Sequence, residues 1–230
     1  MPTPLESMRI VARHLSPLEV PFTFVGGAVM CVLVDHPELT EFRPTKDVDV
    51  VVEVATYAEF SALETRLRAA EFEHDTSPGA PICRWVVEGC RVDVMPMDSR
   101  ALGMNSKWFP EVLRISKRTA LGEGINANVV SPAMFLATKL EAFKDRGKGD
   151  FYMSHDLEDI ITLVDGRAEI VADVAAAPDE ARAFIAGWFA KQLGKPDFME
   201  AIPGHLPAMI GSRQRLPIVI NRLKAIASNG

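Results

Sequence analysis

Apolar runs and amphipathic stretches alternate along the first part of the chain. Residues 5–15 repeat apolar side chains at helical spacing, and residues 22–25 (Phe-Thr-Phe-Val) are an apolar run short enough for a buried strand. The pair Gly26-Gly27 follows, and residues 28–34 then read as another helix. The pattern therefore predicts the order helix, strand, glycine turn, helix.

Residues 47–52 (Asp-Val-Asp-Val-Val-Val) alternate with the period of two that is typical of a strand. This period predicts that Asp47 and Asp49 lie side by side on one face, while the alternate valines point into a core. Thr56 has the residue type of a helix N-cap, and the apolar stripe that follows it predicts a helix to about Ala70.

A second pair of strands is predicted around a short connection that contains a glycine. Residues 82–87 and 91–95 flank Glu88-Gly89-Cys90, which indicates two antiparallel strands. Asp93 stands in the middle of the second strand among apolar neighbours. We expect this strand to lie antiparallel and adjacent to residues 47–52, so that Asp93 joins the two earlier aspartates.

Helical patterns dominate after about residue 97. Residues 108–119 and 131–143 read as helices, and Pro132 stands at a first helical position, where its missing N–H costs nothing. Residues 145–150 have the composition of a loop, and helices resume at Ser154.

These elements together predict an α+β fold. Strands between about residues 20 and 97 would form a small mixed sheet with flanking helices, within a first domain of residues 1–130. Residues 131–230 would form a helical region that closes the active-site cleft.

Composition narrows the class of protein. The chain has 230 residues, 48% of them apolar, which is enough to bury a sizeable core. We find neither an apolar run of about eighteen residues nor a signal-peptide pattern, so we expect a cytoplasmic protein that does not enter the membrane. The formal charge of −6 argues against non-specific coating of nucleic acid but allows a local basic patch. The cysteines Cys31, Cys83 and Cys90 lack metal-site spacing, and we expect reduced, buried thiols.

Three aspartates are candidate metal ligands. Asp47 and Asp49 share one face, and carboxylates held so close repel each other unless a positive charge lies between them. Mg²⁺ prefers a few carboxylates together with substrate phosphates, so the pair predicts this cation. With Asp93 as a third ligand, two Mg²⁺ ions would activate an attacking hydroxyl and stabilise the leaving pyrophosphate. Asp98 competes with Asp93 for this place, and each aspartate alone is also typical of a solvated or edge position.

Gly26 and Gly27 are the candidate phosphate contacts. Without side chains, both let a phosphate approach the backbone, and the free N–H groups of the following helix would face the anion. An ordinary strand-turn-helix has the same pattern, so the ordered combination with the aspartates is what favours a site.

Charged residues in the second half complete the candidate set. Lys139 lies on the apolar stripe of its helix, where an ammonium group needs an anion such as a triphosphate; snorkelling to water is the alternative. Asp156 follows the predicted cap Ser154 and could orient Lys139 or accept a proton, although Asp156 and Asp159 also suit the first turn of any helix. His155 is a weaker candidate for a base.

Basic clusters and tryptophans are further candidates for contacts with a nucleic acid. The clusters are also typical of solvated helix faces, and the tryptophans are most simply core anchors that could also stack on a base. The basic clusters are Arg114, Lys117 and Arg118; Lys144, Arg146 and Lys148; and Arg213, Arg215, Arg222 and Lys224, while the tryptophans are Trp85, Trp108 and Trp188.

The ordered motifs resemble those of the AbiEii-type nucleotidyltransferases, the toxin branch of the DNA polymerase β-like superfamily. The resemblance spans about residues 22–165 and rests on the hydrophobic-Gly-Gly segment and on Lys139 and Asp156 in a helical second half. It also rests on the motif Arg43-x-Thr45-x-Asp47-x-Asp49. It implies a polymerase β-like nucleotidyltransferase sheet, Mg²⁺ and a nucleoside triphosphate substrate.

The resemblance also implies a role for each candidate residue. Asp47 and Asp49 would be the metal-binding pair and Asp156 the acidic residue of the last motif. The residues that would contact the nucleotide are Gly26, Gly27, Thr45 and Lys139. Several relatives transfer nucleotides onto tRNA as toxins, so tRNA and a cognate antitoxin are the partners that the resemblance implies.

Three functional interpretations stay open. The first is Mg²⁺-dependent transfer of a nucleoside monophosphate from a nucleoside triphosphate to an acceptor, with tRNA as the acceptor and a toxin–antitoxin role. The second is the same chemistry on a small polycation such as an aminoglycoside, which an acidic cleft would suit. The third is a nucleotide-binding module that transfers nothing.

Overall fold

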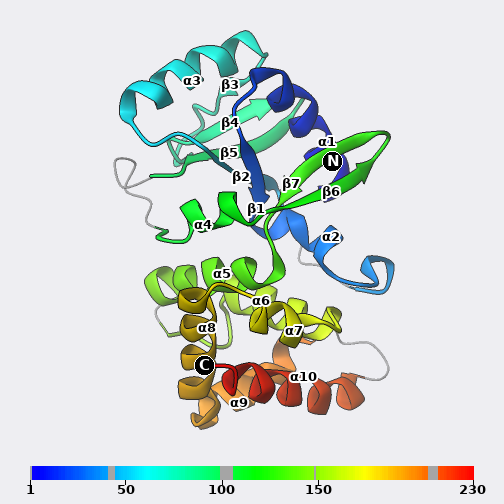
Figure 1. Ribbon diagram of the computed structural model, residues 1–230. Helices are drawn as coiled ribbons and strands as arrows, with labels where there is room; N and C mark the ends of the chain where they lie inside the picture. The colour runs from blue at the N-terminus through cyan, green and yellow to red at the C-terminus, as the bar shows by residue number, and fades with distance from the viewer. Residues whose placement is uncertain (1, 41–44, 99–105, 148, 207–211) are drawn as a thin grey trace. The chain divides into compact units, whose positions relative to one another are not determined.

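The computed structural model describes residues 2–40, 45–98, 106–147, 149–206 and 212–230 (Figure 1). Contacts within the chain divide it into two units. The first unit comprises Met1–Val32 and Pro44–Val130, and the second unit comprises Leu33–Arg43 and Ser131–Gly230. None of the helices in the described segments combines the length and the apolar character that a membrane span requires.

A mixed sheet forms the centre of the first unit. Its strands within the described residues are β1 (Phe22–Val25), β2 (Asp47–Val52), β3 (Glu73–His74), β4 (Arg84–Val87), β5 (Cys90–Pro96), β6 (Lys117–Gly122) and β7 (Ile125–Val129). They are ordered β3-β4-β5-β2-β1-β7-β6 across the sheet. β2 pairs parallel with β5, β1 pairs parallel with β7, and the remaining neighbours pair antiparallel. The α+β class predicted from the sequence is confirmed.

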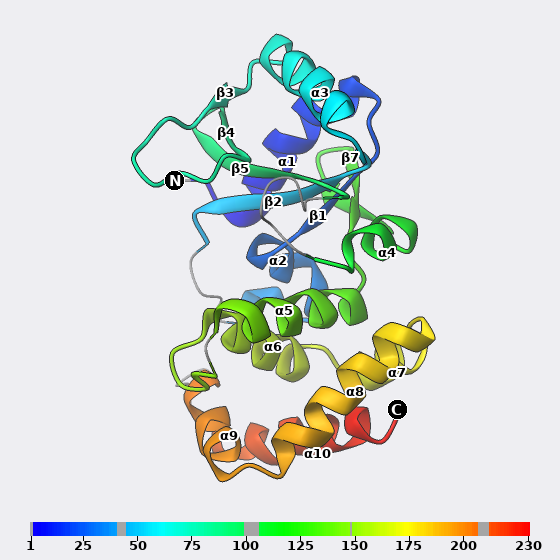
Figure 2. The same ribbon diagram turned by 90° about the vertical axis from the view of Figure 1, so that its left-hand side faces the viewer.

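Among the described residues, helices α1 (Pro4–Leu15), α3 (Tyr57–Ala69) and α4 (Phe109–Arg114) flank this sheet. α1 contacts β2, β5, β6 and β7, while α4 contacts β1 and β2. Figure 2 shows α1 and α3 on one face of the sheet and α4 on the other. The predicted cap at Thr56 is confirmed, because its side chain accepts a hydrogen bond from the backbone N–H of Glu59.

The second unit is helical. Its helices are α5 (Pro132–Arg146), α6 (His155–Gly166), α7 (Ile170–Ala175), α8 (Asp179–Leu193), α9 (Pro196–Ala201) and α10 (Ser212–Ala227). Ser131 and Ser154 cap α5 and α6 through bonds from backbone N–H groups, as the sequence predicts. α5 packs against α6, α7 and α8, and α10 packs against α6, α7 and α8.

A short excursion of the chain also belongs to the second unit. α2 (Met30–Leu33) leads out of the first unit, and the backbone N–H of Asp35 then donates to the carbonyl of Gly166 at 3.0 Å. The guanidinium of Arg167 donates to the carbonyl of Leu33 at 3.0 Å. These bonds attach the excursion to the end of α6.

Three expectations about the first unit are wrong. Residues 28–34 do not form one helix, because a 3₁₀ turn (Gly27–Val29) precedes the single turn of α2. The helix expected over residues 108–119 ends at Arg114, and β6 begins at Lys117. The sheet therefore extends beyond residue 97.

The third correction concerns the direction of β5. We expected β5 to run antiparallel to β2, and it runs parallel. The connection between them holds α3 and the β3 and β4 strands, which is long enough for the crossover that a parallel pair requires. The two strands are neighbours as expected.

Candidate functional site

β2 and β5 bring three carboxylates to one face of the sheet. Asp49 and Asp93 are direct partners in the parallel register, and Asp47 shares the face of Asp49 because side chains alternate along β2. Val48, Val50 and Val52 are buried on the other face, which confirms the predicted alternation. Asp93 is only 8% exposed, whereas Asp47 and Asp49 are half-buried.

Arg84 on β4 lies between two of these carboxylates. Its Nε donates to Asp93 Oδ1 at 2.7 Å and its Nη2 donates to Asp93 Oδ2 at 2.8 Å. The same Nη2 donates to Asp47 Oδ2 at 2.7 Å. The hydrogen bonds that Arg84 donates to Asp93 and the nearby negative charges raise the pKa of Arg84 above its ordinary value, so the guanidinium stays charged. We call Asp47, Asp49, Asp93 and Arg84 the carboxylate cluster.

Sequence reasoning missed Arg84, although the hairpin contained a signal for it. Val87 and Cys90 are paired, so the turn consists of Glu88 and Gly89 alone and Cys90 belongs to β5. Counting back from this turn places Arg84 opposite Asp93, as the structure has it. Opposite charges on facing residues of antiparallel strands attract each other.

Gly26 allows Asp49 to lie against the backbone that follows β1. Its φ angle is +68°, and a Cβ atom at this position would lie 1.9 Å from Asp49 Oδ2. A side chain at residue 26 would thus displace the carboxylate, and it would also be strained at this φ. Gly27 begins a 3₁₀ turn that leads into the single turn of α2, instead of the longer helix that the sequence predicted.

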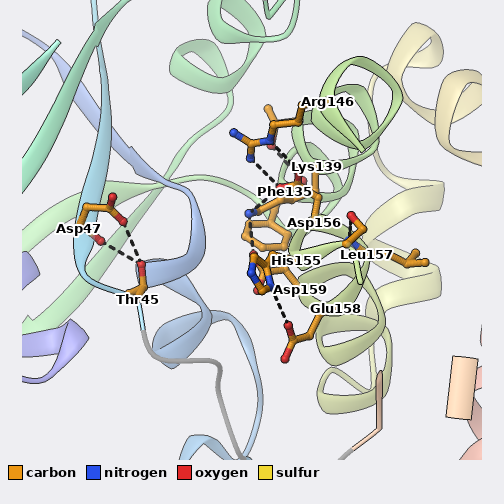
Figure 3. A network of polar contacts seen from close by, with 12 residues as sticks. Thr45, Asp47, Phe135, Lys139, Arg146, His155, Asp156, Leu157, Glu158 and Asp159 are labelled. Carbon is orange, nitrogen blue, oxygen red and sulfur yellow. Dashed lines mark hydrogen bonds and ion pairs between the residues drawn. The ribbon is translucent and has the colours of Figure 1, made fainter. Parts of the chain in front are cut away.

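Thr45 supports Asp47 from the preceding residues. Its hydroxyl lies 3.2 Å both from the backbone oxygen and from Oδ1 of Asp47 (Figure 3). This places Thr45 beside the first ligand of the predicted metal pair. Arg43 of the same motif lies outside the described residues.

The carboxylate cluster has the oxygen donors that Mg²⁺ prefers. As arranged here, however, no group of three or more His, Cys, Asp or Glu side chains among the described residues could hold a metal ion. Arg84 supplies the positive charge that the sequence led us to expect from a cation, and it is tied to Asp47 and Asp93. With Arg84 in this place, the cluster is a network of carboxylates around a guanidinium and not an arranged metal site.

The second unit holds a different ion cluster on α5 and α6. Lys139 Nζ lies 2.6 Å from Asp159 Oδ2 and 3.2 Å from Asp156 Oδ1 (Figure 3). Arg146 donates from Nε and Nη2 to the two oxygens of Asp156, both at 2.8 Å. Lys139, Asp156 and Asp159 are 8%, 5% and 6% exposed. We call Lys139, Arg146, Asp156 and Asp159 the lysine cluster.

Burial and ion pairing shift the pKa of Asp156 in opposite directions. Burial raises its pKa, but the hydrogen bonds and charges of Arg146 and Lys139 outweigh burial, and the pKa of Asp156 lies below its ordinary value. Lys139 is therefore held between carboxylates, and does not snorkel to water. Asp156 contacts Lys139, as the sequence suggested, while His155 is exposed and lies 3.4 Å from Glu158 Oε2.

Several side chains of the basic clusters form ion pairs or hydrogen bonds with nearby residues. Arg114 pairs with Glu111, Arg215 pairs with Asp165, and Arg222 donates to the backbone oxygens of α6. Lys144 and Lys224 are exposed. Lys148 and the side chain of Arg213 lie outside the described residues.

The cysteines and two tryptophans belong to the structural framework. The three cysteines are free; Cys83 and Cys90 are buried, and Cys31 is half-buried. Burial raises the pKa of Cys31 to about 11 and that of Cys83 to about 12, so neither is a thiolate near neutral pH. Trp85 and Trp108 are buried in the first unit, as expected of core anchors, whereas Trp188 is only partly buried.

Comparisons with known proteins bear on the fold. No protein-family model matches the chain, and the comparison with curated proteins finds no match. Among solved structures, the chain is similar to an antigenic nucleotidyltransferase-like protein from Paracoccidioides brasiliensis, with 20% identity and a TM-score of 0.53. The similarity covers 90% of this chain and 94% of the other. The chain thus has a nucleotidyltransferase-like fold.

Proposed function

We propose that the chain is a Mg²⁺-dependent nucleotidyltransferase that moves a nucleoside monophosphate from a nucleoside triphosphate to an acceptor. The observation that carries this proposal is the carboxylate cluster, with Asp49 and Asp93 in register on adjacent strands of a nucleotidyltransferase-like fold. Asp47, Asp49 and Asp93 would hold the cation. Bound there, Mg²⁺ would supply charge stabilisation for an in-line displacement.

Arg84 is not part of the sequence motifs, but it has a role in this proposal. While it bonds to Asp47 and Asp93, it neutralises charge that a cation would otherwise neutralise. A guanidinium released from the carboxylates can bind phosphate oxygens with two parallel hydrogen bonds. We therefore assign Arg84 two alternative partners, the carboxylates in the metal-free protein and the triphosphate in the loaded one.

In this proposal the lysine cluster positions α5 relative to α6. The sequence suggested that Lys139 contacts the triphosphate, but its ammonium lies between two buried carboxylates. A buried ion of this kind is stable only while its partners remain in place. Lys139, Asp156 and Asp159 then join α5 to α6.

The resemblance of the motifs to the AbiEii-type enzymes supports RNA, and tRNA in particular, as the acceptor, with a toxin role restrained by an antitoxin. Arg146 is engaged with Asp156, so it is a poor choice for testing contacts with RNA. Lys144 is exposed on the same helix and can be neutralised without breaking a described ion pair. Phosphate contacts weaken as salt rises, so RNA labelling should fall with ionic strength and fall less steeply in Lys144→Gln.

The test is incubation with each labelled nucleoside triphosphate and either total RNA or an aminoglycoside, with Mg²⁺ or with a chelator. We expect label on RNA when Mg²⁺ is present and none with the chelator. Asp49→Asn should label at least about 100-fold less, because it removes a ligand of the cation whose charge would stabilise the transition state. Asp145→Asn, on the exposed end of α5, is the matched control and should label normally.

Two other outcomes would redirect the proposal. Label on the aminoglycoside and none on RNA would keep the chemistry and replace the acceptor. Equal labelling by wild type and Asp49→Asn, or binding of nucleotide with no transfer to either acceptor, would reject the enzyme and favour the nucleotide-binding module.

A further inference from the structure

A pocket of about 530 Å³ lies entirely within the second unit. Its walls are the end of α5, residues 149–151 and one side of α8. The volume is within the range of about 300–1,000 Å³ that small-molecule sites occupy. Neither the carboxylate cluster nor the lysine cluster lines it, so it is separate from the site described above.

The charge of the pocket opposes that of the chain. Lys144, Lys191 and Lys195 line it and are exposed, and no carboxylate is among the lining residues that the structure describes. The whole chain has a formal charge of −6. Three ammonium groups around one cavity, without acidic neighbours in its lining, favour an anionic ligand.

The walls between the lysines are aromatic. Phe143 and Phe151 stack with their ring centroids 5.7 Å apart, and Trp188 meets Phe143 edge to face at 5.8 Å. Lys195 Nζ lies 5.6 Å from the ring centroid of Phe151. Phe143 and Phe151 are themselves buried, whereas Trp188, which also lines the pocket, is partly exposed. An accessible aromatic ring beside ammonium groups is the combination that binds a nucleobase by stacking and its phosphate by charge.

Two residues of α8 shape the pocket further. Gln192 lines it with a side chain that is 6% exposed, and its Oε1 has no hydrogen-bond partner among the described residues. A buried acceptor without a partner is costly, and a ligand N–H group that reaches the amide would satisfy it. Gly187 also lines the pocket, and a Cβ atom placed there would meet nothing within 4 Å.

We propose that this pocket binds a nucleobase with an attached phosphate, either as a free mononucleotide or as the end of a single-stranded nucleic acid. The base lies on the aromatic wall beside Trp188, its N–H groups reach Gln192, and the phosphate lies among Lys144, Lys191 and Lys195. This binding needs no metal and no step at the carboxylate cluster.

The first measurement is tryptophan fluorescence in chelator, because Trp188 is the partly exposed tryptophan and Trp85 and Trp108 are buried in the first unit. We expect saturable quenching by AMP, with adenosine and inorganic phosphate each binding at least 10-fold more weakly. The signal should vanish in Trp188→Phe, while binding of AMP by calorimetry persists.

A 5′-phosphorylated oligoadenylate separates the two sources of the ligand. Binding at least 10-fold tighter than AMP, with a steep loss in salt, assigns the pocket to the end of a nucleic acid. Equal or weaker binding assigns it to a free mononucleotide. No saturable binding of either probe would overturn the proposal.

Paired variants locate the binding. Gly187→Leu fills the open space, whereas Ala190→Leu adds the same side chain to an exposed position of α8 outside the pocket. We expect at least a 10-fold loss of AMP affinity in Gly187→Leu and none in Ala190→Leu. Replacing the three lysines together by Gln should cause a similar loss, with Lys224→Gln as the control. These lysines are exposed, so this variant keeps the test valid if Gly187→Leu folds poorly.

The carboxylate cluster supplies the decisive comparison. Asp49→Asn should bind AMP normally, even if it has lost transfer, so the pocket and the proposed activity can fail separately. Loss of AMP binding in Asp49→Asn together with normal binding in Gly187→Leu would place the ligand at the cluster and overturn the pocket.

Discussion

The carboxylate cluster and the lysine cluster both hold like charges close together, but they differ in how the charges are compensated and in how far solvent reaches them. In the carboxylate cluster, Arg84 bonds to Asp47 and Asp93, and two of the three aspartates are half-buried. In the lysine cluster, Lys139 and Arg146 lie against two buried carboxylates. Solvent reaches part of the first cluster, so an ion from solution can compete with Arg84 there. The carboxylates of the second cluster are closed off from solvent, which suits a structural joint between two helices.

The largest expected effect comes from breaking the lysine cluster. Lys139→Met should lower the free energy of unfolding by about 3–5 kcal/mol, because removing one member of a buried ion pair leaves charge without compensation. The measurement is urea unfolding followed by circular dichroism. Lys144→Met, at an exposed position of the same helix, is the control and should change the free energy by less than about 0.5 kcal/mol.

A double variant sharpens this result. Lys139→Met with Asp159→Leu removes a cation and a carboxylate together and leaves Arg146 bound to Asp156. It should be more stable than Lys139→Met alone. Equal stability of Lys139→Met and wild type would show that the lysine does not stabilise the joint.

The second effect tests the backbone that supports the carboxylate cluster. Gly26→Ala should cost about 1–3 kcal/mol, because the combination of φ +68° and ψ −165° suits glycine alone and the new Cβ would displace Asp49. Gly187→Ala, inside α8 with open space at its Cβ, should instead stabilise the protein by about 0.5–1 kcal/mol. Thermal unfolding of both variants measures the contrast, and a neutral Gly26→Ala would contradict the close approach of Asp49.

The third effect tests whether Arg84 takes the place of a cation. Arg84→Met should lose about 1–2 kcal/mol in chelator, a value reduced because the ion pair is partly exposed to solvent. A Mg²⁺ ion that binds the folded state at this cluster would raise the melting temperature of the variant more than that of wild type. If Mg²⁺ leaves the melting temperature of both proteins unchanged, that result would argue against a cation site at this cluster.

The smallest effect is a difference in acid stability. The pKa of Asp156 in the folded protein lies below its ordinary value, so its pairing contributes stability above the unfolded-state pKa of about 4. That contribution is lost as the pH falls through the lowered folded-state pKa. Asp156→Asn should therefore show a shallower loss of stability below about pH 4 than wild type, measured by urea midpoints across the acid range. Asp145→Asn should follow wild type.

Local rules predicted the parts of both clusters that depend on neighbouring residues. Alternation along residues 47–52 placed Asp47 and Asp49 on one face, and the caps at Ser131 and Ser154 marked the starts of the helices that carry Lys139 and Asp156. These features depend on a few adjacent side chains and backbone groups. They could therefore be predicted without knowledge of the tertiary structure.

Pairing between distant segments was harder to predict. The direction of β5 depends on how the chain returns after α3, and the contact of Arg84 with Asp47 joins strands that are not neighbours in the sheet. The first residues of β6 were read as the end of a helix because β6 is an edge strand in which only Leu121 is buried, which leaves a weak alternation. The Gly122-Glu123-Gly124 turn, with positive φ at all three residues, was the available sign of a hairpin.

The excursion of residues 33–43 has a consequence for dissecting the protein. The chain leaves the first unit after Val32, returns at Pro44 and leaves again after Val130. Cutting the gene after codon 130 would therefore leave Leu33 and Val34 on the fragment of residues 1–130, although both are buried and belong to the second unit. The helical fragment would lose these two apolar side chains, of which Val34 lies beside Gly166. Complementation by two co-expressed halves should accordingly fail for a cut at 130 unless a peptide covering the excursion is supplied to the helical half.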